Sequence, residues 1–139
     1  MFGSSSAARL KLDYADPTSR TVGTELVCSS ITSGGNGADS VPATHPWMPW
    51  NPHLRFYNNQ RGYVRTRIQP ALMTANFRVL PYVTSPGAAA HTRATFVIED
   101  RSPGLHRTTD TPTPTATPPG APRTPTPPLD TVHQETDRP

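Results

Sequence analysis

The stretch "GYVRTRIQPALMTANFRVLPYV", residues 62–83, decides the fold class of this chain. Residues 62–68 alternate in polarity, so one side of an extended strand carries Val64, Thr66 and Ile68. The opposite side carries the aromatic and basic residues Tyr63, Arg65 and Arg67. Residues 74–83 alternate in the same way, with an apolar side made of Ala75, Phe77, Val79, Pro81 and Val83. Because only "QPALM" separates the two runs, we predict an antiparallel hairpin.

Two further stretches read as strands, and the chain as a whole reads as mainly β. Residues 21–28, "TVGTELVC", are mostly β-formers, and residues 92–99, "TRATFVIE", place Ala94, Phe96 and Ile98 on one face. Pro81 cannot donate to a ladder, so its end of the strand is predicted to be an edge or a bulge. One short helix is predicted near the N-terminus, capped by Ser6, with Leu10 and Tyr14 four residues apart.

Composition sets the size of the foldable part. The chain has 139 residues, of which 33% are hydrophobic, and its 18 prolines are concentrated toward the C-terminus. From Ser102 onward the large aliphatic residues are Leu105, Leu129 and Val132. Such a composition does not offset the entropy lost on ordering. We therefore predict one folded region over residues 1–104 and a disordered Pro/Thr-rich tail over residues 105–139.

The long segment 29–53 is predicted to be an irregular loop. It contains "SGGNG", residues 33–37, which lacks the lysine and following helix of a phosphate loop and reads as a glycine turn. It also contains Trp47 and Trp50, which argue against plain disorder. We interpret these tryptophans as residues that pack on something outside this sequence.

The basic residues raise an alternative function. The net charge is +3, which permits nucleic-acid binding without requiring it. "RGYVR", residues 61–65, begins like an RNA-recognition submotif, but Val64 and Arg65 stand where that motif needs other residues. Tyr63, Arg65 and Arg67 on one face could stack a base and hold phosphate. A solvated strand face explains them too and is favoured at this charge, so nucleic acid is kept as the alternative partner.

No catalytic or metal-binding group emerges from the residues alone. The single cysteine, Cys28, excludes an internal disulfide and a cysteine-based zinc site, and it reads as a small buried hydrophobe. The histidines lack the short regular spacing of metal ligands; they are His45, His53, His91, His106 and His133. We assign no catalytic residue, no metal ligand and no defined binding residue. No stretch is long and apolar enough for a signal peptide or a membrane span, so as written the chain is expected in the cytoplasm.

Residues 11–104 resemble the C-terminal segment of the PhoD-like alkaline phosphatases, the alkaline phosphatase D family. The stretches that carry the resemblance are "KLDYADPTSRTVGTELVCSSITSGGNG", "NPHLRFYNNQRGYVRTRIQP" and "ANFRVLPYVTSPGAAAHTRATFVIEDRSPGL". The resemblance implies a calcineurin-like α/β sandwich, of which this mainly β chain is a partial piece. It also implies hydrolysis of phosphate monoesters and diesters with an iron and calcium centre, and export by the twin-arginine route.

The same resemblance places the metal ligands upstream of the matched part. Where the family has its last Gly-Asp-Val-His-like motif, this chain has "MFGSSSAARLKLDYADP". No iron or calcium ligand is therefore carried over, and no role is assigned to Asn58, Asn59 or Arg61. We expect a truncated phosphatase that is inactive alone, unless His45 or His53 acts with Asp39. Its expected partner is the missing N-terminal part, or a separate subunit that it completes. Without that part, burial should be lost at Trp47, Trp50, Phe56, Phe77 and Phe96.

Overall fold

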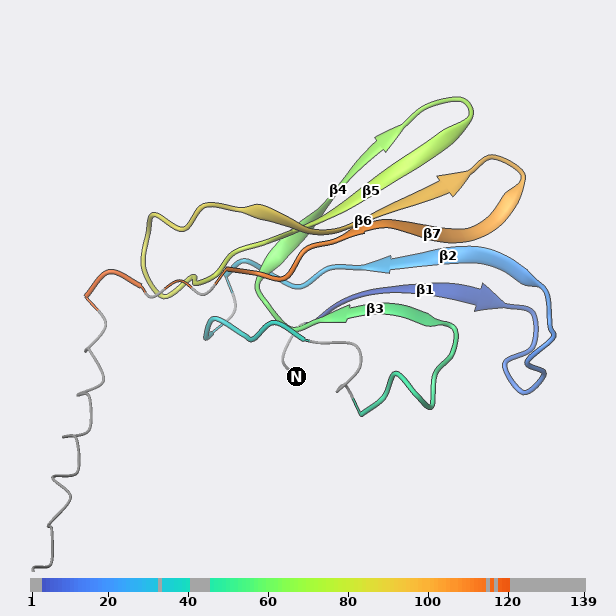
Figure 1. Ribbon diagram of the computed structural model, residues 1–139, viewed down its shortest axis with the longest axis horizontal. Helices are drawn as coiled ribbons and strands as arrows, with labels where there is room; N and C mark the ends of the chain where they lie inside the picture. The colour runs from blue at the N-terminus through green and yellow to red at the C-terminus, as the bar shows by residue number, and fades with distance from the viewer. Residues whose placement is uncertain (1–3, 33, 41–45, 115, 117, 121–139) are drawn as a thin grey trace, which may run out of the picture.

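The computed structural model describes residues 4–32, 34–40, 46–114, 116 and 118–120. Within these residues the chain forms two antiparallel sheets (Figure 1). The three-stranded sheet has the order β2-β1-β3, with β1 at Ser5–Lys11, β2 at Thr21–Val27 and β3 at Leu54–Asn58. The four-stranded sheet has the order β4-β5-β6-β7, with strands at Gly62–Ile68, Leu72–Val79, His91–Glu99 and Ser102–Asp110.

The mainly β fold class is thus confirmed. The described residues contain no helix, and therefore none long and apolar enough to cross a membrane. The calcineurin-like architecture, with mixed sheets and flanking helices, stays a prediction about a larger domain.

The predicted N-terminal helix is wrong. Its residues form β1, the central strand of the three-stranded sheet, in which Ala7 pairs with Leu26 on one side and Phe56 on the other. Ala7 is fully buried and Ala8 nearly so. Small side chains permit close packing at this central position, and the tertiary contacts override a weak helix propensity.

The predicted hairpin is confirmed. β4 and β5 pair antiparallel from Gly62↔Val79 to Ile68↔Met73, and Ala75, Phe77 and Val79 are buried as the alternation indicates. The predicted strand was too long, because β5 ends at Val79. Pro81 therefore lies beyond the ladder, where its missing donor costs no strand pairing.

The predicted boundary at residue 104 is also wrong. β7 crosses it, and Leu105 is only 2% exposed. The ladder with β6 satisfies the backbone of this segment, which offsets its polar, proline-rich composition. Residues 121–139 of the predicted tail lie outside the described residues.

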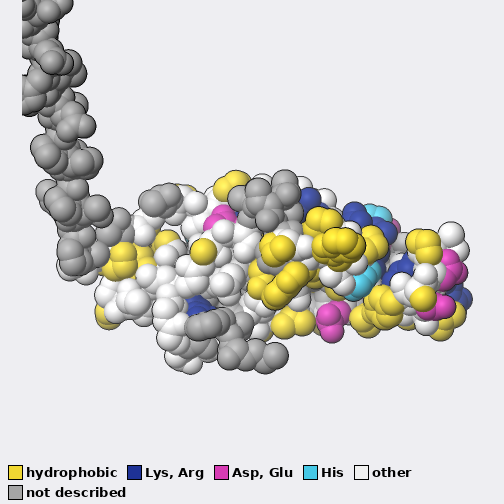
Figure 2. All heavy atoms as spheres, turned by 90° about the horizontal axis from the view of Figure 1, so that it is seen from below, with side chains coloured by type: hydrophobic (Ala, Val, Ile, Leu, Met, Phe, Trp, Pro, Cys, Tyr) yellow, Lys and Arg dark blue, Asp and Glu magenta, His cyan; other side chains and the backbone are white. Residues whose placement is uncertain are grey.

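A core of phenylalanines lies between the two sheets. The ring centroids of Phe56 and Phe77 are 4.7 Å apart, and Phe96 lies 5.9 Å and 5.8 Å from them. All three are at most 1% exposed, so the expectation that they lose burial is wrong. Trp47 is 58% and Trp50 84% exposed, and for these two the expected loss of burial stays a prediction. Hydrophobic atoms accordingly gather on the side seen from below, where the loop before β3 lies (Figure 2).

Candidate functional site

The stretch "NNQRG", residues 58–62, joins the two sheets and is buried. It leads from the end of β3 to the start of β4, and Asn58, Gln60 and Arg61 are all at most 5% exposed. Buried polar groups need hydrogen-bond partners, so the partners of these side chains show what the motif does.

Arg61 is held by the glycine-rich loop. Its Nε donates to the carbonyl oxygen of Gly35 at 2.9 Å, and its Nη2 donates to that of Gly34 at 2.6 Å. A phosphate-binding loop presents N–H donors to its ligand, whereas here the loop presents carbonyl acceptors to an arginine. The described part of the loop therefore supports the interpretation as a glycine turn.

Two more contacts fix this loop. Asn36 Oδ1 accepts hydrogen bonds from the backbone N–H groups of Val83 at 2.8 Å and Thr84 at 3.2 Å. Gly37 has a φ of 71°, and a Cβ there would clash with the backbone of Asn59. The loop is thus clamped between the β3–β4 connection and the segment after β5.

The amide side chains continue the network. Asn58 Nδ2 donates to Asp39 Oδ1 at 2.6 Å, while Asn58 Oδ1 accepts from the backbone N–H of Gln60 at 2.8 Å. Gln60 Oε1 accepts from Thr113 Oγ1 at 2.6 Å. Asp39 Oδ2 also accepts from the backbone N–H of Thr113 at 2.9 Å. The connection between β3 and β4 is thereby tied to the segment that follows β7.

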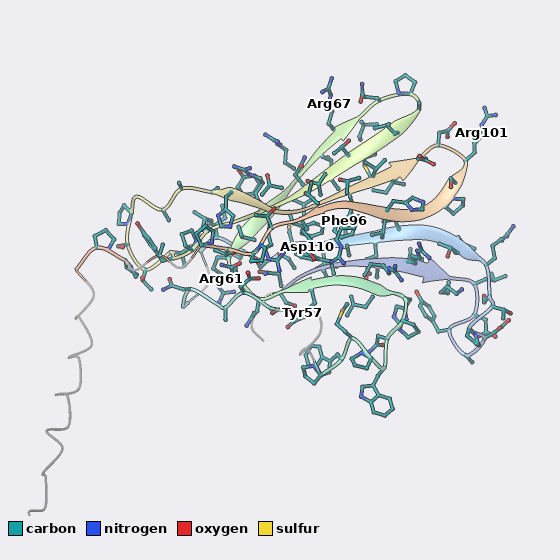
Figure 3. All side chains as sticks on the ribbon, viewed as in Figure 1. Tyr57, Arg61, Arg67, Phe96, Arg101 and Asp110 are labelled. Carbon is teal, nitrogen blue, oxygen red and sulfur yellow. The ribbon has the colours of Figure 1, made fainter. Side chains whose placement is uncertain are left out.

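Arg93 supplies the charge that balances these carboxylates. Its side chain is 3% exposed, and its Nε donates to Asp39 Oδ1 at 2.8 Å, while its Nη1 pairs with Asp110. Burial alone would lower the pKa of Arg93, but the hydrogen bonds to the two carboxylates outweigh it and raise that pKa. We call the set Asp39, Asn58, Gln60, Arg61, Arg93, Asp110 and Thr113 the polar network. Figure 3 labels two of its members, Arg61 just before β4 and Asp110 at the end of β7.

His91 borders the polar network. Its Nε2 lies 3.2 Å from Thr113 Oγ1. Burial lowers the pKa of His91, and the positive charge of Arg78 lowers it further, while Asp39 acts in the opposite direction.

The residues that the structure describes do not fit an iron and calcium centre. Among the described residues no three His, Cys, Asp or Glu side chains group as metal ligands would. Asp39 and Asp110 are both occupied by Arg93, so a divalent cation there would sit against a guanidinium. His53 precedes β3 and stacks edge-on against Tyr14, whereas Asp39 bonds to the last residue of β3, so the strand separates the two. His45 lies outside the described residues.

The other residues singled out from the sequence are exposed. Arg65, Arg67 and the 39%-exposed Tyr63 all lie on β4. Arg67 points away from the molecule near the tip of the hairpin (Figure 3). Cys28 is exposed, so its interpretation as a buried hydrophobe is wrong: β2 ends at Val27, and Cys28 lies beyond the sheet.

Sequence reasoning missed the central residue of the polar network, Arg93. The available signal was a charge inside the apolar run "TRATFVIE". A charge that enters a core needs a partner of opposite sign. The carboxylates that pair with Arg93 belong to Asp39 and Asp110, which are 54 and 17 residues from it in the sequence, so no local pattern links them to it.

Comparison with known proteins places this fold in a family. A sequence model described as PhoD-like phosphatase matches residues 4–77. Alkaline phosphatase D of Bacillus subtilis (strain 168) is 45% identical over 105 residues, which are 76% of this chain and 18% of that protein. A solved chain described as "Structure of PhoD" matches with a TM-score of 0.72 and 43% identity, over 80% of this chain and 21% of that one.

These matches confirm the resemblance seen in the sequence and set its extent. The chain spans only about a fifth of the length of both relatives. The family match covers β1 to most of β5, including the "NNQRG" connection. The chain belongs to the PhoD-like phosphatase family.

Proposed function

We propose that this chain is a scaffold segment of a metal-dependent phosphate ester hydrolase and does not hydrolyse such esters alone. Membership of a phosphatase family supports the reaction class. The observation that carries the scaffold role is the polar network. Polar side chains of the kinds found in active sites make hydrogen bonds here that join the two sheets.

The proposal assigns the metal centre to parts of the domain outside this sequence. The acidic groups of the polar network are balanced by Arg93 and Arg107, so a metal ion there would be repelled by the guanidiniums that already pair with these carboxylates. No step of the hydrolysis is therefore assigned to residues described here.

Hydrolysis of bis-p-nitrophenyl phosphate tests the first part. The purified chain, with and without added iron and calcium, should give no turnover above a protein-free blank. Metal-dependent turnover that survives repurification would refute the scaffold assignment.

A chimera tests the second part. The matched segment of Bacillus subtilis alkaline phosphatase D is replaced by this chain, and hydrolysis is expected to be retained because the fold is the same. Arg93→Met should weaken this rescue by destabilising the segment. Arg101→Met should leave it intact, because Arg101 is exposed on the β6–β7 turn (Figure 3). A folded chimera without activity would refute an interchangeable scaffold.

The partner of this segment is, on the same proposal, the remainder of the domain, either in one chain or as a separate subunit. Trp47 and Trp50 are large aromatic side chains that are 58% and 84% exposed, and such residues are enriched at interfaces. Co-expression with the relative lacking its matched segment should give a complex that co-purifies. Trp47→Ala combined with Trp50→Ala should weaken it, and separate elution of the two parts would count against the proposal.

Nucleic-acid binding is the second candidate, favoured by the exposure of Tyr63, Arg65 and Arg67 on one strand. A salt-sensitive gel shift with single-stranded RNA, lost in Arg65→Met with Arg67→Met, would support it. No shift at low salt would remove it.

A further inference from the structure

A cleft opens between the two sheets and adjoins the polar network through the ion pair of Arg107 with Asp110. Its volume is about 600 Å³, and residues of both sheets line it. Its apolar wall includes Phe96 and Leu105, and its polar groups are Arg9, Arg55, His106 and Arg107. We call it the basic cleft. Its volume falls in the range of pockets that hold small organic ligands.

The basic cleft carries positive charge that its own lining does not balance. Three arginines line it, and no aspartate or glutamate does. They come from different strands, with Arg9 on β1, Arg55 on β3 and Arg107 on β7. Arg107 donates one bond, from Nη1 to Asp110 at 2.6 Å, which leaves its other guanidinium donors for a ligand.

Arg9 holds a donor without an acceptor. Its Nε is buried and has no hydrogen-bond partner among the described residues. Gly104 of β7 lies beside it with a φ of 127°, and a Cβ there would be 3.6 Å from that Nε. A Cβ at that distance would make an ordinary van der Waals contact, so the positive φ is what favours glycine here, and β7 packs directly against the Arg9 guanidinium. A buried N–H of a charged group without an acceptor is costly, and a bound anion would remove that cost.

We propose that the basic cleft binds a small phosphate ester that carries an apolar group. A single guanidinium fork satisfies the two oxygens of a carboxylate, whereas three guanidiniums offer more donors than a carboxylate can use. A phosphate monoester presents three oxygens and up to two negative charges. Its organic group would lie against Met48 and Leu54, the half-buried apolar side chains of the lining, where burial of apolar surface adds affinity.

This site is distinct from the proposed function, because it needs neither a metal nor hydrolysis. The probe is therefore phenylphosphonate, whose carbon–phosphorus bond a phosphatase does not hydrolyse. Its binding to the full 139-residue chain is measured by calorimetry in metal-free buffer at fixed ionic strength. Benzoate and inorganic phosphate are titrated in parallel, since each lacks one half of the proposed ligand.

Phenylphosphonate is expected to bind at least roughly tenfold more tightly than either comparison ligand. Arg9→Met should weaken its binding roughly ten- to a hundredfold, the usual effect of losing hydrogen bonds to a charged group. Arg101→Met is the matched control on the exposed β6–β7 turn and should bind as the wild type does. Hydrolysis assays of the same samples report on the proposed function separately.

Arg9→Met removes an unpartnered donor, so it should unfold at a temperature no lower than the wild type. Arg55→Met is a second variant that tests the cleft if Arg9→Met loses its circular dichroism spectrum. Equal affinity of wild type and folded cleft variants would overturn the proposal, as would the absence of phenylphosphonate binding. Benzoate binding as tightly as phenylphosphonate would overturn the phosphate assignment, and equally tight inorganic phosphate would overturn the apolar one.

Discussion

Replacing Arg93 by methionine should destabilise this chain more than any loss of an exposed charge. Methionine keeps most of the apolar stem of arginine and removes the guanidinium. The side chain is 3% exposed and pairs with Asp39 and Asp110, which are 22% and 30% exposed. The substitution therefore leaves Asp39 without its cation, while Asp110 keeps one arginine partner, Arg107.

The magnitude follows from those exposures. Removing one partner of a fully buried ion pair costs about 3–5 kcal/mol, because the remaining charge stays buried and unpaired. Both carboxylates here reach some solvent, which lowers the cost, and Asp39 keeps its bonds from Asn58 and Thr113. We expect the free energy of unfolding to fall by about 2–4 kcal/mol, a large share of the stability of a small domain.

Urea denaturation followed by circular dichroism measures this change, with the slope of the transition checked between variants. Arg101→Met is the matched control, because Arg101 pairs with Asp100 at 3.3 Å with exposures of 92% and 58%. That variant should stay within about 0.5 kcal/mol of the wild type, since exposed pairs contribute little. If Arg93→Met cost no more than Arg101→Met, the polar network would not hold the sheets together.

Three further predictions test other parts of the fold by the same denaturation assay. Phe96→Ala should lower the free energy of unfolding by about 3–5 kcal/mol, because the ring is fully buried. Trp50→Ala should change it by less than about 0.5 kcal/mol, because Trp50 is 84% exposed. Similar costs for the two variants would contradict the described core. The pKa of His91 is lower in the folded chain than its ordinary value of 6.5. Below pH 6.5 the unfolded chain therefore binds more protons, and the free energy of unfolding should fall as the pH drops. A His91→Gln variant should lose this part of the pH dependence, and identical pH profiles for the variant and the wild type would refute the prediction. Gly37→Ala should be more destabilising than Gly35→Ala, because both have positive φ but only Gly37 lacks space for a Cβ; equal costs would show that the loop is not clamped.

The strands that sequence reasoning found carry their signal within a few residues, either as alternating polarity or, in β2, as a run of β-forming residues. β4 and β5 carry their polarity pattern and their turn in one continuous stretch, so pattern and pairing agree. β1 was mistaken for a helix because alanine and leucine favour helices when no neighbour is known. Its strand state comes from β2 and β3, and β3 starts 43 residues after β1 ends, at Leu54 after Lys11.

The missed β7 shows the limit of composition as a guide. "SPGLHRTTD" has one large aliphatic residue, Leu105, and reads as polar linker. Its order comes from pairing with β6 and from the place that Leu105 takes beside Phe96 in the core. Whether a segment buries a side chain and satisfies its backbone hydrogen bonds depends on the partner strand as much as on the segment itself.

The polar network holds the fold together, and the basic cleft is the region proposed to bind a ligand. The polar network gathers where β3 and β7 end and β4 begins, and each of its charged groups has a partner of opposite sign or a carbonyl. The basic cleft lies farther along the sandwich and holds arginines with donors to spare. A buried charge that is fully paired fixes a structure, while one that is not paired makes binding of an opposite charge favourable. Arginines that look alike in the sequence thus have different roles, structural in the polar network and ligand-binding in the basic cleft. Only the positions of their partners in the fold distinguish the two roles.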